Sequence, residues 1–144
     1  CFIAEIQQTS NITYRIYDYD RTDATGNKRE LHTELAKDAI DYRLEKDYRT
    51  AYTPVADQPV HLVECKYFET NLLDLTQPIS RDWSELDSFV IYICMEGKVT
   101  LRDAQGNEVH LHQGQSVLVP AENPSLTLTP EGSVKLLETY IPAK

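Results

Sequence analysis

The chain has 144 residues, of which 41% are hydrophobic and 26% charged, and its formal net charge is -9 at pH 7. These proportions are those of a folded globular protein and exclude a disordered chain, while the longest apolar run, residues 89–95, is too short to span a bilayer. The negative charge disfavours nucleic acid or an anionic membrane as the main partner, although a local cluster of arginine and lysine could still bind a small anionic substrate.

The first elements are two β-rich stretches, residues 1–7 and 12–18, separated by a polar break that suits a turn. They predict a β-hairpin. A three-residue loop would set Glu5 opposite Arg15 on one face, whereas a loop of two or four residues would remove that pairing. The residue pattern alone favours a half-exposed ion pair without chemistry. Because Cys1 already lies inside a strand, we expect residues 1–20 to be the last hairpin of a truncated domain.

The middle of the chain is predicted to be a connector over residues 21–57. An exposed polar loop at residues 22–28 precedes apolar residues at helical spacing, which predict a helix over about residues 29–43. Residues 45–59 contain charges and two prolines with little periodicity, so we interpret them as a linker.

From residue 58 onward, short β-rich runs alternate closely with turn residues. Many short strands with no helix between them predict an antiparallel sandwich or barrel. The predicted strands are residues 61–75, 88–96, 98–102, 108–112, 116–119, 125–129 and 134–141.

The segment from Gly114 to Pro120 has the spacing of the second cupin motif, in which glycine turns the chain into a strand and proline ends it. In metal-binding cupins a glycine and a histidine follow, and those positions fall here on Glu122 and Ser125. The acidic ligand of the first motif falls on Val90, with no histidine nearby. The resemblance implies a cupin fold without the cupin metal site.

Two further features bear on a metal and on the cellular compartment. His110 and His112 share a strand face and could bind zinc or copper. No third ligand is suggested by the spacing, so we interpret them as two exposed histidines and leave adventitious metal binding open. The three cysteines are not closely spaced and leave an odd one over, which fits a reducing cytoplasm.

The string from Glu5 through Arg15 to Arg21, followed by a helix opening at Arg29 to His32, resembles the C-terminal part of the short bacterial type I mannose-6-phosphate isomerases. That family holds zinc with Gln, His, Glu and His in a cupin-like catalytic domain. The resemblance implies that all four ligands precede Cys1, so no cofactor is expected in this chain itself.

The resemblance places Arg15 at the family's active-site arginine and Glu5 beside the site. An aldose–ketose isomerisation passes through an enediolate, whose negative oxygens need fixed positive charge. Arg15 is therefore expected to stabilise the transition state. Glu5 is expected to act as an acid or base, or to orient the arginine.

Together these observations predict an all-β, cupin-like antiparallel jelly roll or sandwich with one connecting helix, in which residues 58–144 form a metal-free domain. The predicted function is that of the C-terminal part of a zinc-dependent isomerase acting on a sugar phosphate, with the isolated chain inactive. The alternative is a non-catalytic cupin module that binds carbohydrate or mediates dimerisation. We also expect that hydrophobic strands left exposed by the truncation could pair edge to edge between chains and form a homodimer.

Overall fold

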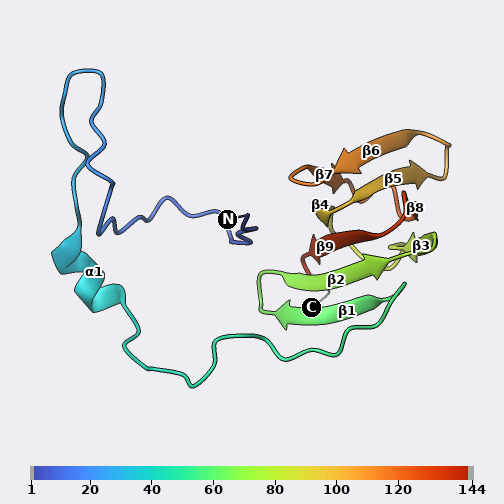
Figure 1. Cartoon of the computed structure of the whole chain (residues 1–144), viewed down its shortest axis with the longest axis horizontal. Helices are drawn as coiled ribbons and strands as arrows, with labels where there is room; N and C mark the ends of the chain where they lie inside the picture. Colours follow the sequence, from blue (N-terminus) through green and yellow to red (C-terminus); the bar gives the residue numbers. More distant parts are fainter. Residues whose placement is uncertain (1, 143–144) are drawn as a thin grey trace. The chain divides into compact units, whose positions relative to one another are not determined.

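The computed structural model describes residues 2–142, and its strands form two antiparallel sheets (Figure 1). The five-stranded sheet has the order β1 (Pro59–Glu64), β2 (Glu69–Leu75), β9 (Val134–Tyr140), β4 (Val90–Glu96) and β7 (Ser116–Val119). The four-stranded sheet has the order β3 (Ile79–Asp82), β8 (Ser125–Pro130), β5 (Lys98–Asp103) and β6 (Glu108–His112). The prediction of an all-β antiparallel fold with one helix is confirmed.

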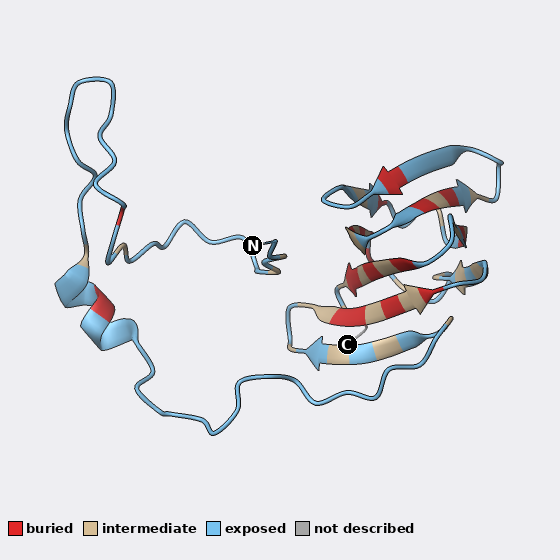
Figure 2. Ribbon diagram, in the orientation of Figure 1, coloured by how far each residue is buried: buried red, intermediate tan, exposed pale blue. Residues whose placement is uncertain are grey.

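The core consists of side chains from alternate positions on these strands, as half-buried strands require. On β4 the inward residues are Val90, Tyr92 and Cys94, and all three are almost inaccessible to solvent. Figure 2 shows that the buried residues lie mainly in the strands, whereas the helix and the loops before Pro59 are largely exposed. Strands from both sheets contribute to the core, so it holds the two sheets together.

Two strand predictions differ from the structure in detail. The run expected at residues 61–75 is two strands, β1 and β2, which form an antiparallel hairpin closed by a hydrogen bond from Cys65 N to Phe68 O. The short strand β3 was not predicted, because its four residues include Arg81 and Asp82 and show little apolar alternation. It pairs with β8, so the partner strand supplies the order that the local sequence does not indicate.

The chain divides into two compact units, Cys1–Ile6 with Arg49–Lys144, and Gln7–Tyr48. The predicted N-terminal hairpin is wrong, because no strand forms in residues 2–20. Ile3, Ile12 and Ile16 are each more than half exposed. These side chains have no apolar surface to cover them, and an isolated hairpin is marginal without such packing.

The helix is also shorter than predicted. Helix α1 covers only Thr33–Ala39, instead of residues 29–43. His32 gives the first turn no side-chain cap, and Ile40 is already extended, so neither end supports further turns. Within residues 2–142, no helix reaches the length and apolarity of a membrane span.

Candidate functional site

The unit Gln7–Tyr48 is organised around a buried carboxylate, Asp18, which is 7% exposed. Arg21 donates to its Oδ1 from Nε at 3.1 Å and from Nη2 at 2.5 Å. Arg29 also donates to it, through Nε to Oδ2 at 2.8 Å and through Nη2 to Oδ1. The hydrogen bonds from Arg29, supported by the charge of Arg21, hold the pKa of Asp18 far below its ordinary value. Asp18 is therefore a fixed anion that positions two guanidinium groups.

A tight turn immediately after Asp18 brings Arg21 back to it. Tyr19 and Asp20 both have positive φ, 52° and 53°, and Arg21 N donates to Asp18 O at 3.0 Å. These are the features of a type I′ turn, in which glycine, asparagine and aspartate predominate, so Tyr19 is the unusual residue here. Left-handed backbone costs about 1 to 2 kcal/mol per residue, so contacts elsewhere must offset it. The hydrogen bonds of Arg21 and Arg29 to Asp18 are contacts of this kind.

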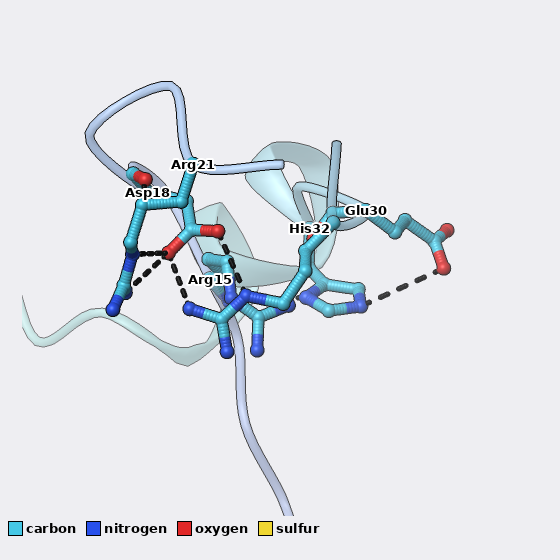
Figure 3. A network of polar contacts seen from close by, with 6 residues as sticks. Arg15, Asp18, Arg21, Glu30 and His32 are labelled. Carbon is cyan, nitrogen blue, oxygen red and sulfur yellow. Dashed lines mark hydrogen bonds and ion pairs between the residues drawn. The ribbon is translucent and has the colours of Figure 1, made fainter. Parts of the chain in front are cut away.

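Arg15 is held in place through its main chain by His32, the residue that precedes helix α1. Arg15 N donates to His32 Nδ1 at 3.0 Å, and His32 N donates to Arg15 O at 2.6 Å. Because Nδ1 accepts a hydrogen bond here, the imidazole hydrogen lies on Nε2, which is 3.8 Å from the Glu30 carboxylate. These contacts tie the residue before the helix to the backbone of Arg15. They fix the position from which the Arg15 side chain projects (Figure 3).

The guanidinium of Arg15 donates through Nη1 to the main-chain oxygen of Glu30 at 3.0 Å. No carboxylate in residues 2–142 forms an ion pair with it, in contrast to Arg21 and Arg29, which share Asp18. We call Asp18, Arg21 and Arg29 the Asp18 cluster. Figure 3 shows Arg15 beside this cluster and beside His32. The cluster therefore has more positive than negative charge. This local excess in an acidic chain is the arrangement that a small anion requires.

Glu5 and Arg15 lie in different units, and Glu5 lies on the exposed, irregular segment before Gln7. Its carboxylate makes no hydrogen bond or ion pair with any other part of the described chain. The cross-strand pair of Glu5 and Arg15 that the predicted hairpin would have formed is therefore not found, since residues 2–20 form no strand. The roles expected for Glu5 and Arg15 stay predictions.

A second polar network lies at Glu138 of β9, inside the unit that contains both sheets, Cys1–Ile6 with Arg49–Lys144, which we call the cupin-like unit. Glu138 is completely buried and accepts two hydrogen bonds from Arg81, from Nε at 2.9 Å and from Nη2 at 2.8 Å. Tyr92 donates its hydroxyl to Glu138 Oε2 at 2.9 Å, and Trp83 Nε1 donates to the Tyr92 oxygen at 3.2 Å. Burial, with the nearby Glu138 charge, raises the pKa of Tyr92. The four side chains form one satisfied interior network.

The residues at the cupin motif positions are placed as follows. Gly114, with φ at +88°, turns the chain into β7, and Pro120 follows the end of that strand. Val90, at the position expected for an acidic ligand, is a buried core residue of β4. Glu122 and Ser125 are exposed at the turn and at the start of β8. Gly114 and Pro120 thus bound strand β7 as in the motif, whereas the positions of the metal ligands hold a buried valine and two exposed residues.

The zinc implied by the family resemblance does not fit the residues of this chain. In the range 2–142, no three His, Cys, Asp or Glu side chains gather closely enough to hold a metal ion. His110 is bonded instead to Thr100 Oγ1 at 2.8 Å, and His112 Nδ1 lies 3.0 Å from Gln113 O. Both histidines are exposed on β6, as predicted.

The residues that organise both networks, Asp18 and Glu138, were not among the predicted site residues. Asp18 lies within the string that carries the family resemblance, but its role depends on two arginines at different distances along the chain. Glu138 did carry a signal: it occupies an inward position in the alternation of β9, between Leu136 and Tyr140. A charged residue at such a position predicts a buried partner, which the structure identifies as Arg81.

Comparison with known proteins gives consistent results. The profile of the family described as "Mannose-6-phosphate isomerase, cupin domain" matches residues 59–141. Two proteins of Bacillus subtilis are similar: the putative mannose-6-phosphate isomerase YvyI is 29% identical over 96% of this chain and 43% of its own length, and the mannose-6-phosphate isomerase ManA is 31% identical over 81% and 36%. The chain therefore spans less than half the length of these relatives.

Solved structures confirm the cupin-like fold. The mannose 6-phosphate isomerase of Bacillus subtilis superimposes with a TM-score of 0.64 at 26% identity, over 88% of this chain and 39% of that one. A cupin-2 domain protein of Shewanella frigidimarina superimposes with a TM-score of 0.51 at 14% identity, over 60% of this chain and 82% of that one. The second likeness shows the fold alone. Because the family profile matches more than half of the chain, the protein belongs to the mannose-6-phosphate isomerase cupin-domain family.

Proposed function

We propose that this chain is the C-terminal part of a zinc-dependent mannose-6-phosphate isomerase of the cytoplasm, which interconverts mannose 6-phosphate and fructose 6-phosphate. In this proposal residues 1–20 belong to the catalytic domain and residues 58–144 are a metal-free cupin-like domain. Residues 21–57 connect the two domains. The zinc ligands belong to sequence before Cys1. The family membership and the length of the relatives support the proposal.

The observation that carries the proposal is that Arg15 is held in position and has no carboxylate partner among residues 2–142. Its main chain is fixed by His32 on both sides, and its guanidinium has no carboxylate partner among residues 2–142. A guanidinium that is already positioned and not neutralised can meet negative charge on a substrate with little reorganisation.

The chemistry assigned to Arg15 is stabilisation of the enediolate. Moving a proton between C1 and C2 of the sugar leaves negative charge on the adjacent oxygens, and planar N–H groups can donate to one or both of them. Arg21 and Arg29 add positive charge nearby while remaining bound to Asp18, which favours an anionic sugar phosphate over the neutral sugar. Glu5 is proposed to shuttle the proton or to orient a polar group of the substrate.

Substitution of Arg15 in the longer protein tests this role. Arg15→Ala should lower kcat for mannose 6-phosphate by about 100-fold or more while zinc content and folding are unchanged. Arg15→Lys should recover little, because an ammonium lacks the planar pair of donors. Arg43, an exposed arginine paired with Asp41, offers the control: Arg43→Ala should leave kcat unchanged. Full turnover by Arg15→Ala would contradict the proposal.

A further inference from the structure

The cupin-like unit has a pocket of about 400 Å³ lined by residues at the end of β1, the start of β2, the end of β3 and the end of β9. This volume lies within the range of small-molecule sites. The residues that the argument uses are two aromatic side chains and four carboxylates: Trp83, Tyr140, Glu64, Glu69, Asp82 and Glu85. The pocket thus combines flat apolar walls with a set of hydrogen-bond acceptors.

The aromatic wall is rigid. Trp83 is held by the hydrogen bond from its Nε1 to Tyr92, by the Arg81 guanidinium 4.4 Å from its ring centre, and by Tyr140, whose ring centre is 4.9 Å away. Tyr140 is itself fixed by Asn71, which donates to the Tyr140 oxygen at 3.3 Å. A ligand that packs against these rings would therefore not need to immobilise them, which lowers the cost of binding.

The chemistry of the walls selects the class of ligand. A pyranose or furanose ring has an apolar C–H surface that packs on aromatic rings, and hydroxyl groups that donate to carboxylates. The negative charge of four carboxylates opposes a phosphorylated sugar. An organic cation would gain from the same charge, but Arg81 already occupies the cation–π position over Trp83, which weakens the attraction for a second cation.

We propose that this pocket binds an uncharged carbohydrate through the Trp83 and Tyr140 rings and the surrounding carboxylates, and that it discriminates against the sugar phosphate. The assignment of a sugar rests in part on the proposed isomerase function. The pocket would then be a second carbohydrate site that prefers an uncharged sugar, whereas Arg15 and the Asp18 cluster favour an anionic one. A sugar-phosphate enzyme with such a pocket could sense the unphosphorylated sugar.

Trp83 is the chain's single tryptophan, so its fluorescence reports on the pocket directly. The metal-free 144-residue chain is titrated with D-mannose, with mannose 6-phosphate and with tetramethylammonium chloride at constant ionic strength. We expect a saturable change with D-mannose, with a midpoint of about 10 mM or lower, and at least about threefold weaker binding of mannose 6-phosphate. No saturable response to D-mannose, or tighter binding of the cation, would overturn the proposal.

Variants that replace a carboxylate by an amide test whether the sugar binds in this pocket. The double variant Asp82→Asn with Glu85→Gln should improve mannose 6-phosphate binding relative to D-mannose by about threefold or more, because two like charges are removed. Glu131→Gln removes an exposed charge outside the pocket and should leave the ratio unchanged. Equal behaviour of the two variants would overturn the proposed location. Because the titration needs no metal and follows no turnover, its failure would leave the role of Arg15 intact, whereas loss of that role would not alter binding here.

Discussion

Asp18 illustrates how one residue can organise a segment that has almost no hydrophobic core. In the unit Gln7–Tyr48, the buried side chains are those of Asp18 and Ala36. The turn at Tyr19 and Asp20, the return of Arg21 and the approach of Arg29 all depend on the same carboxylate. The order of this unit should consequently depend on the ionisation of Asp18 more than on apolar burial.

This dependence predicts a specific response to pH. The pKa of Asp18 is depressed in the folded chain, so its stabilising contribution is fully present above the ordinary carboxyl value of about 3.8 and is lost as the pH falls through the depressed folded value. Carbon-13 NMR of the Asp18 carboxyl group should therefore show no titration near pH 3.8. In Asp18→Asn the guanidinium signals of Arg21 and Arg29 should resemble those of exposed arginines at every pH. Titration of Asp18 near its ordinary value would contradict this description of the cluster.

At the residue scale, the sequence was sufficient to single out Arg15 only through its resemblance to a family. Asp18 and His32 could not be assigned roles, because each acts through a residue that comes close only after folding. His32 meets Arg15 across 17 positions of sequence, and no local pattern encodes that contact.

At the scale of the element, the turns of the cupin-like unit set the positions of the strands. Gly97 joins β4 to β5 with φ at +78°, and a Cβ added there would lie 2.2 Å from the main-chain oxygen of Ser133. Gly106 joins β5 to β6 with a similar φ of +89°, but a Cβ there would meet nothing within 4 Å. Both glycines therefore need a left-handed backbone, but only Gly97 lacks the space for a Cβ.

This pair gives a matched prediction. Both Gly97→Ala and Gly106→Ala incur the cost of a left-handed backbone, about 1 kcal/mol. Gly97→Ala should destabilise the chain by at least about 2 kcal/mol more, because main-chain atoms of β9 and of the turn before it must move. Urea unfolding followed by Trp83 fluorescence measures the difference. Equal free energies of unfolding for the two variants would show that the close approach of Gly97 to Ser133 is not a constraint.

The interior network gives a second prediction for the elements that carry it. Glu138→Leu leaves the Arg81 guanidinium without its partner beneath the sheet, and the expected cost is about 3 to 5 kcal/mol of unfolding free energy. The double variant Arg81→Met with Glu138→Leu should recover much of this loss, because neither charge is then buried alone. Additive losses in a double-mutant cycle would contradict the coupling.

At this scale the sequence predicted most strands, because alternating apolar residues and positive-φ glycines mark them clearly. The helix prediction failed at both ends, because apolar spacing continues at residues 29–31 and 40–43 although no helix forms there and Ile40 is extended. Before the helix, the main-chain oxygen of Glu30 and the main-chain nitrogen of His32 are bonded to Arg15 instead. The N-terminal stretches have β-rich composition but form no strand, which shows that composition without a buried face does not make a sheet.

For the whole molecule, the proposed function assigns to this chain the arginine of an isomerase site, and assigns the metal ligands to other sequence of the longer protein. The arginine cluster is formed by residues within Gln7–Tyr48, and the cupin-like unit has a core and a network of its own. The family profile matches residues 59–141 and no residue of Gln7–Tyr48, so the family match and the arginine cluster lie in different parts of the chain.

The most direct measurement of this claim is the conversion of mannose 6-phosphate to fructose 6-phosphate by the 144-residue chain after incubation with zinc, assayed beside the longer protein. The account predicts rapid conversion by the longer protein and none above the buffer rate by the chain alone. Conversion by the chain alone would contradict the account, because the residues described here would then have to hold the metal as well as the arginine.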